Sequence, residues 1–173
     1  MASSIGEQRG EVSEELGRAG VIAERVTALM DREFVVFLIS MRINSWWKIH
    51  KWLPVARAML RMGKELESKP NSGYLGGQVV PGLVVQYWES LDHLVRYARD
   101  RQGQHYPAWA DFYRRIGTSG DVGIWHETYL VGPGTYECVY VNMPPHGLGR
   151  VGKIVSASGA RATAKQRVGS ARI

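Results

Sequence analysis

Cysteine is almost absent from this chain of 173 residues, since Cys138 is the only one. A single thiol excludes a disulfide within the chain and is typical of proteins in the reducing cytoplasm. It also excludes a zinc site built from a Cys/His cluster. The glycine-rich loops that bind nucleotides and dinucleotides are missing, and so is the Gly-x-Ser-x-Gly turn of hydrolases. The chain therefore lacks a binding motif for flavin or nicotinamide.

Long apolar runs are also missing. No stretch approaches the ~20 apolar residues that span a bilayer, and the acidic N-terminal segment does not resemble a signal peptide. We therefore expect no membrane partner and a cytoplasmic location.

Acidic residues are absent after Glu137, and six basic residues follow it: Arg150, Lys153, Arg161, Lys165, Arg167 and Arg172. These six account for the whole net charge of +6, because the remaining 16 basic residues balance the 16 acidic ones. A Ser/Gly/Ala-rich tail with scattered charge is typical of disorder. The sequence thus predicts a basic, disordered tail over residues 150–173 and no nucleic-acid partner.

A strongly apolar stretch at Phe34–Asn44 dominates what is present. It is rich in β-branched and aromatic residues and contains no Gly or Pro, so it predicts a buried strand. Around it, alternation and helical periodicity predict a helical arm, three helices and four further strands. The predicted helices are 21–30, 54–68, 91–98 and 107–116, and the further strands are 74–80, 83–88, 124–131 and 136–143, the last two forming a hairpin. Pro54 is expected in the first turn of its helix and Ser90 as an N-cap.

This order predicts an α+β fold of the ferredoxin-like β-α-β-β-α-β type, an antiparallel sheet with helices on one face. The predicted organisation is a polar arm over residues 1–32, a folded domain over 33–149 and the tail. Helices on one side leave the other side of an apolar sheet bare, which is a liability for a monomer. We therefore expect a homodimer whose two sheets pack face to face, a dimeric α/β barrel.

Several unusual motifs carry a family resemblance, namely Arg42–Lys48, Lys51–Pro54, Val85–Ser90, Pro107–Trp109, Gly120–Tyr129 and Tyr140–Pro145. Together they resemble a small monooxygenase-like family found in fumagillin-type biosynthetic clusters, near haem-dependent alkene oxygenases of the trans-anethole oxygenase type. The resemblance implies a dimeric α/β barrel, a superfamily that also holds haem-containing aldoxime dehydratases. It further implies an enzyme of secondary metabolism and haem b, or no cofactor at all.

Two of the five histidines are candidate haem ligands. His126 is flanked by Trp125 and Glu127 in a predicted strand, where its neighbours point to the opposite face. It is either a core histidine or an iron ligand or general base in the cleft between sheet and helices. His105 is the rival, because in haem-binding relatives the ligand lies on the helix that follows a strand end like Trp88–Ser90. We place His126 slightly ahead as the axial ligand.

Other polar and aromatic residues are candidates for cofactor or substrate contacts. Arg42 and Lys48 are either propionate partners or ordinary surface charges. Trp47 and Trp88 are either core residues or part of a pocket for a flat cofactor. Asn142 and Gln86 are amides in apolar strands, so either is expected to need a hydrogen-bond partner such as oxygen or substrate.

These residues are compatible with three functions. The first is a haem-dependent oxygenase that epoxidises or cleaves a small apolar unsaturated or aromatic substrate with oxygen or peroxide. The second is a cofactor-free monooxygenase of polyketide metabolism, with Asn142 handling protons. The third is a non-catalytic dimeric haem or small-ligand binder.

Overall fold

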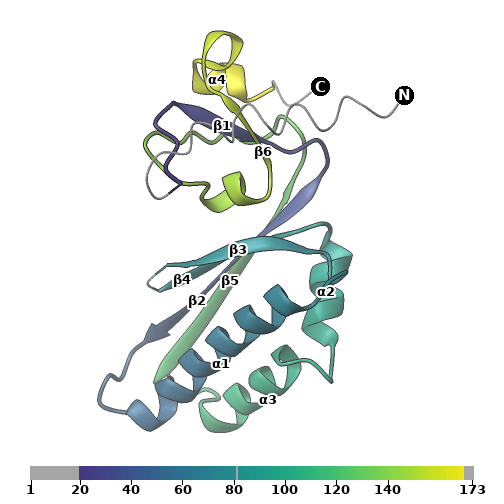
Figure 1. Ribbon diagram of the computed structural model, residues 1–173. Coiled ribbons are helices and arrows are strands. Elements are labelled where there is room, and N and C mark those ends of the chain that lie inside the picture. The colour runs from purple at the N-terminus through teal and green to yellow at the C-terminus, as the bar shows by residue number, and fades with distance from the viewer. Residues whose placement is uncertain (1–19, 81, 170–173) are drawn as a thin grey trace. The chain divides into compact units, whose positions relative to one another are not determined.

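The computed structural model describes residues 20–80 and 82–169 of the chain, which divides into two compact units (Figure 1). Glu33–Val131 form one unit, called the core unit below. Residues 20–32 and 132–169 are the described part of the other, called the flanking unit. Within the described part of the chain, no helix is long and apolar enough to cross a bilayer.

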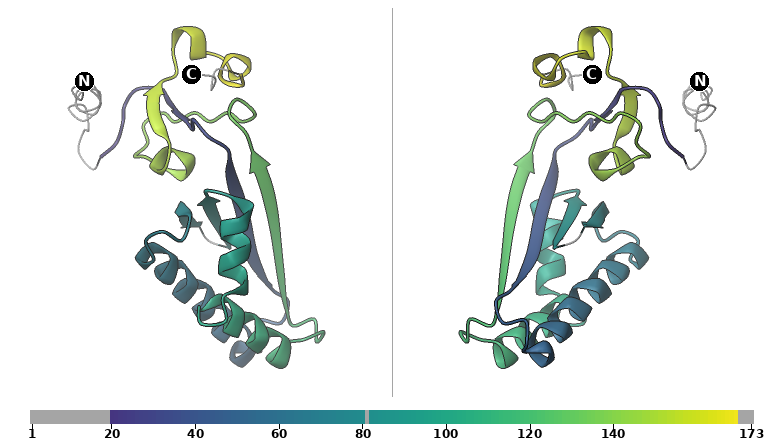
Figure 2. Two further views of the ribbon diagram at one scale, coloured as in Figure 1. Left: turned by 90° about the vertical axis from the view of Figure 1, so that its right-hand side faces the viewer. Right: turned by 90° about the vertical axis from the view of Figure 1, so that its left-hand side faces the viewer.

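The core unit contains four strands and three helices in the order expected for a ferredoxin-like fold. They are β2 (Phe34–Ile43), α1 (Ile49–Ser68), β3 (Tyr74–Val80), β4 (Leu83–Trp88), α2 (Leu91–Arg99), α3 (His105–Arg115) and β5 (Val122–Val131). The strands form one antiparallel sheet in the order β3-β4-β2-β5. Figure 2 shows the helices on a single side of this sheet. The predicted α+β fold, with helices on one face, is confirmed.

The strand register fixes which side chains face the helices. Phe37 of β2 pairs with Gln86 of β4 and with Thr128 of β5, and Ile39 pairs with Val84 and His126. Because side chains alternate along a strand, these rows share the face of Val35, which packs beneath the helices. Trp125, Glu127 and Tyr129 therefore lie on the opposite face.

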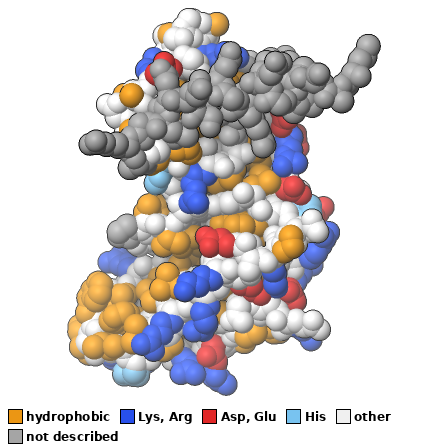
Figure 3. All heavy atoms as spheres, in the orientation of Figure 1, with side chains coloured by type: hydrophobic (Ala, Val, Ile, Leu, Met, Phe, Trp, Pro, Cys, Tyr) orange, Lys and Arg blue, Asp and Glu red, His pale blue; other side chains and the backbone are white. Residues whose placement is uncertain are grey.

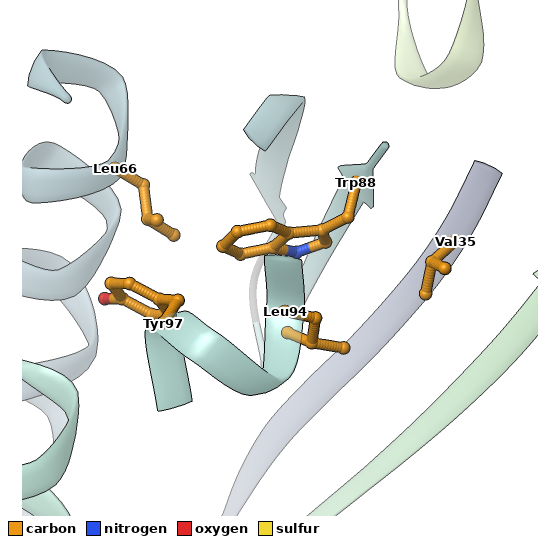
Figure 4. Close-up of a cluster of buried hydrophobic side chains, with 5 residues drawn as sticks. All are labelled: Val35, Leu66, Trp88, Leu94 and Tyr97. Carbon is orange, nitrogen blue, oxygen red and sulfur yellow. The ribbon is translucent and has the colours of Figure 1, made fainter. Parts of the chain in front are cut away.

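The main core cluster lies at one end of the helix-facing side. Trp88 is fully buried at the end of β4 and packs in one cluster with Val35, Leu66, Leu94 and Tyr97 from β2, α1 and α2 (Figure 4). Its ring centroid lies 5.5 Å from that of Tyr97. This cluster fixes α1 and α2 against the sheet and so holds apart the walls of the site described below.

The ends of α1 and α2 differ in how well the sequence predicted them. Ser90 caps α2 as expected, since its side chain accepts a hydrogen bond from the backbone N–H of His93. Helix α1 begins at Ile49, so the prediction that Pro54 opens it was wrong. Pro54 lies in the second turn and cannot donate to the carbonyl of His50. The start of α1 is instead fixed by Asp121, which accepts hydrogen bonds from Lys48 and Lys51.

The flanking unit corrects two predictions, those for residues 21–30 and 136–143. Residues 26–29 form strand β1 (Val26–Leu29), although 21–30 was predicted as a helix. Strand β1 is completely buried and pairs with β6 (Lys153–Ser156), so tertiary pairing overrides the helical spacing. Residues 136–143 do not form a hairpin with β5, which pairs with β2. They instead bridge the N-terminal segment, through Val26 with Tyr140 and Ile22 with Met143.

The basic tail is also ordered over its described residues, contrary to the prediction of disorder. Besides β6 it contains short helical turns, η2 (Gly147–Arg150), η3 (Gly159–Arg161) and α4 (Ala164–Arg167). Arg167 is buried and ion-pairs with Glu137 at 2.8 Å. The core unit ends at Val131, whereas the domain predicted from the sequence extends to residue 149. The predictions for residues 1–19 and 170–173 lie outside the described residues.

Candidate functional site

An apolar cavity of about 330 Å³ lies between the sheet and the helices of the core unit. Its floor is made by the helix-facing rows of the sheet, namely Phe37, Ile39, Val84, Gln86, His126 and Thr128. Its roof is made by Met59 and Met62 of α1, by the apolar side of α2, and by His105 and Trp109 of α3. A volume of this order is typical of small-molecule sites.

A second cavity of about 280 Å³ adjoins the first. The two share five lining residues: Ile39, Met59, Met62, His105 and Trp109. The second cavity is bordered by the guanidinium-bearing residues Arg57, Arg61 and Arg115. The shared wall therefore has an apolar chamber on one side and a cationic rim on the other.

His105 occupies this shared wall in a defined tautomer. Its Nδ1 lies 3.0 Å from the carbonyl oxygen of Ala98. A carbonyl only accepts, so Nδ1 carries the proton and Nε2 keeps its lone pair. Burial lowers the pKa of His105, the neighbouring His126 adds to this effect, and the Ala98 carbonyl opposes it. The ring is held between Tyr97, at 5.7 Å, and the stacked indole of Trp109, at 6.4 Å.

His126 lies on the opposite wall, on the edge strand β5. Its ring packs against that of Phe37 with centroids 5.5 Å apart, and the residue is exposed. The structure thus brings His105 and His126, the two histidine candidates, to the same cavity, one on the helices and one on the sheet.

Gln86 adds a polar group to the buried end of the floor. Its Oε1 accepts a hydrogen bond of 3.1 Å from the indole Nε1 of Trp88. Because an indole N–H only donates, this contact fixes which end of the amide is oxygen. Trp88 itself belongs to the core cluster and does not line either cavity.

The other predicted site residues lie elsewhere. Lys48 lies just before α1, and its Nζ forms an ion pair with Oδ1 of Asp121 at 2.7 Å. Arg42 is exposed on the face of the sheet away from the helices, as its pairing with Gly123 shows. Trp47 is exposed in the loop before α1, and Asn142 is exposed in the flanking unit, with a positive φ of 52°. None of these four residues lines the cavity of His105 and His126.

The main residues that sequence reasoning missed are on the roof. Met59 and Met62 have the i, i+3 spacing of an apolar helix side, and Trp109 begins a similar series on α3. That spacing indicates burial but does not distinguish a filled core from a cavity wall. Apolar side chains also gather over the first turns of α1 (Figure 3), where Trp46, Trp47 and Ile49 are more than half exposed.

The histidines of the cavity do not belong to a larger metal-binding group. Among residues 20–80 and 82–169, no three His, Cys, Asp or Glu side chains are placed to hold a metal ion together.

The architecture defines a ferredoxin-like α+β unit with a histidine-bearing apolar cavity between sheet and helices. Solved structures share this fold. An aldoxime dehydratase in complex with butyraldoxime matches with a TM-score of 0.59 and 14% identity, over 86% of this chain and 43% of that one. A second aldoxime dehydratase matches with a TM-score of 0.58 and 15% identity, over 86% and 44% of the two chains.

Residues 34–148 match the family described as monooxygenase af470-like, so the chain belongs to this family. Among curated relatives, monooxygenase af470 of Aspergillus fumigatus is 26% identical over 144 residues. The match covers 82% of this chain and 50% of the relative, so the chain spans about half the length of that protein. The family resemblance stated from the sequence is confirmed.

Proposed function

We propose that the protein is a haem-dependent monooxygenase acting on a small apolar substrate, with the His105 cavity as its active site. The observation that carries the proposal is the imidazole of His105, which presents an unprotonated Nε2 in an apolar cavity. Membership of a monooxygenase family supports the reaction class, and the resemblance to a haem-containing superfamily supports the cofactor.

The residues present fit a haem group. Iron ligation needs a neutral imidazole whose second nitrogen is oriented by a partner, and the Ala98 carbonyl provides that partner for His105. His126 has no such partner among the described residues and lies on an exposed edge strand. We therefore place His105 ahead of His126 as the axial ligand, the reverse of the order favoured by the sequence.

Haem propionates need cations at the edge of the cavity. Lys48 and Arg42 do not line either cavity, but Arg57 and Arg61 of α1 border the adjoining one. Arg115 also borders it and is ion-paired with Asp111 at 3.2 Å. Arg57 and Arg61 are thus the residues expected to hold the propionates through charge-assisted hydrogen bonds.

The remaining side chains have distinct tasks in this proposal. Haem would supply the activation of oxygen or peroxide. The roof and floor side chains would hold an apolar substrate and exclude water from it, since the lining is dominated by Phe, Ile, Leu, Met, Val and Trp. His126, on the wall facing His105, would take up or release a proton at its ring nitrogen.

Absorption spectroscopy of the purified protein titrated with haem tests the proposal. We expect a band near 400 nm that saturates at one haem per chain. His105→Ala should weaken haem binding at least about tenfold, because the axial bond and its oriented imidazole are lost. His126→Ala should keep the band and lower turnover of an alkene such as a propenylbenzene. His50→Ala, which changes an exposed histidine on α1, is the matched control.

The outcomes separate the alternatives. Colourless protein that oxidises substrate would favour the cofactor-free monooxygenase and contradict the haem proposal. A normal band without turnover would favour a haem binder. Loss of the band in His126→Ala, with His105→Ala unaffected, would reverse the ligand assignment.

A second copy of the chain is proposed to cover the open face of the sheet. Trp125 and Tyr129 are 43% and 49% exposed on this face, beside apolar residues of β2 and β4 such as Leu38 and Val85. The matched region makes up half of the curated relative, so two copies of that region would together equal the length of that protein.

Light scattering in dilute solution tests the dimer. A charge at the β5 edge of this face, Trp125→Glu, should convert a dimer to a monomer, because it removes an apolar contact and adds a carboxylate that would lose its water on association. Trp47→Glu, at a still more exposed tryptophan in the loop before α1, should leave the mass unchanged. A wild-type monomer would contradict the proposal.

A further inference from the structure

The side-chain amide of Gln86 is buried. Its oxygen accepts a hydrogen bond within the protein, and its –NH₂ group is able to donate one to a ligand. The side chain is only 8% exposed and lies on the helix-facing side of β4. Its Oε1 is occupied by the indole N–H of Trp88. No described residue accepts a hydrogen bond from its –NH₂ group. Among the described residues, the side-chain atom buried without a hydrogen-bond partner is a nitrogen of Arg161, so the Gln86 –NH₂ is not sealed in the core and is open to the cavity that Gln86 lines.

The position of Gln86 in the cavity indicates what this donor is for. Gln86 lies beside Phe37 on the floor, and Leu91, Leu94 and Val95 of α2 line the same cavity. The hydroxyl of Tyr97, another polar group of this cavity, already donates a hydrogen bond of 3.4 Å to Glu65. The –NH₂ of Gln86 is therefore a neutral donor without a partner among the described residues, at the buried end of a largely apolar cavity, whose other polar side chains include His105, His126 and Thr128.

We infer that Gln86 determines substrate specificity, and that the substrate is an apolar molecule carrying one hydrogen-bond acceptor, such as a carbonyl, ether or hydroxyl oxygen. The Trp88 indole acts as a positioning residue that holds the amide in the donating orientation. The acceptor would anchor one end of the substrate against Gln86 and leave its apolar body against Leu91, Leu94 and Val95 of α2. This inference rests on the proposed function, because it takes the cavity as the substrate site.

The contrast between two ligands of the same shape tests the inference. Cyclohexanone and methylenecyclohexane differ at one position, where the ketone has its carbonyl oxygen and the alkene a methylene group. Calorimetry gives the dissociation constant of each for the full chain, and we expect the wild type to bind the ketone more tightly. Gln86→Glu retains an acceptor for Trp88 but replaces the donor with a carboxylate oxygen when ionised. Its affinity for the ketone should fall about tenfold, with the affinity for the alkene unchanged within about twofold.

The pH dependence of ketone affinity in Gln86→Glu distinguishes a donor role from a purely structural one, because a structural role would give no such dependence. The carboxyl introduced by Gln86→Glu carries an O–H donor once it is protonated, so lowering the pH should raise the ketone affinity of this variant relative to the wild type, whose cavity contains the same His105 and His126. Gln86→Leu should lose the ketone preference at every pH. Gln78→Leu is the matched control, because Gln78 lies on β3 opposite Val85, on the other face of the sheet.

Equal changes for both ligands in the Gln86 variants, or no change for either, would overturn the inference, as would a wild type that binds neither ligand. Haem spectra of the same samples keep the two proposals apart. A normal haem band with no ketone selectivity contradicts the role of Gln86 alone. Ketone selectivity in a protein that never binds haem contradicts the proposed function alone.

Discussion

Removing the contact between Trp88 and Gln86 should reveal a measurable coupling free energy. Trp88 is fully buried in the core cluster, so Trp88→Phe keeps an aromatic ring but loses part of the packing and the indole N–H. We expect a loss of about 2 kcal/mol in the free energy of unfolding, below the range for truncation to alanine. Gln86→Leu in the wild-type background leaves that N–H buried without its acceptor, which costs about 1–3 kcal/mol.

The double variant should be less destabilised than the sum of the single variants. Once Phe replaces Trp88, Gln86→Leu no longer strands a donor, so its cost should fall by about 1–2 kcal/mol. Urea unfolding followed by tryptophan fluorescence is the appropriate assay, because all six tryptophans lie in the core unit. Effects that add within about 0.4 kcal/mol would show that the two side chains do not depend on each other.

Two further perturbations test other parts of the fold. Gly77→Ala should destabilise the core unit by about 1–3 kcal/mol, because a Cβ there would lie 2.4 Å from the carbonyl oxygen of Val85. Gly63→Ala should instead stabilise α1 by about 0.5–1 kcal/mol, because a Cβ at residue 63 meets nothing within 4 Å. Equal changes in the free energy of urea unfolding for the two variants would refute this contrast. Hydrogen bonds from Lys48 and Lys51 lower the pKa of Asp121, so its stabilisation should be complete above the ordinary carboxyl pKa of 3.8 and be lost as the pH falls below it. Asp121→Asn should therefore flatten the acid dependence of the urea midpoint, and an unchanged slope would contradict the assignment.

The core unit was predictable because local and long-range preferences agree there. β4 is β-branched and aromatic and begins and ends where its sequence pattern does, and Ser90 caps α2 through a local contact. The order of elements then leaves few topologies for an antiparallel sheet with helices on one side.

The flanking unit was not predictable for the opposite reason. β1 is only four residues long, and its partner β6 lies more than 120 residues further along the chain. No local pattern signals such a pairing, so spacing favoured a helix. The basic composition after Glu137 suggested disorder, but Arg167 is held by Glu137 and by backbone carbonyls.

The site was predicted in part. Sequence singled out His105 and His126 because histidine is rare and chemically specific, and both line the cavity. It did not predict the orientation of the His105 ring, because the carbonyl of Ala98 is a backbone group that any residue provides. It also overrated Lys48, whose partner Asp121 lies more than 70 residues away in the chain.

Chemical rescue of His105→Gly measures the central claim most directly. Glycine removes the imidazole and leaves space for a free one. We expect the variant to bind haem weakly and added imidazole to restore the band near 400 nm and the wild-type affinity, whereas His126→Gly needs no rescue. A His105→Gly protein whose haem spectrum matches the wild type without imidazole would contradict the assignment of this cavity as a His105-ligated haem site.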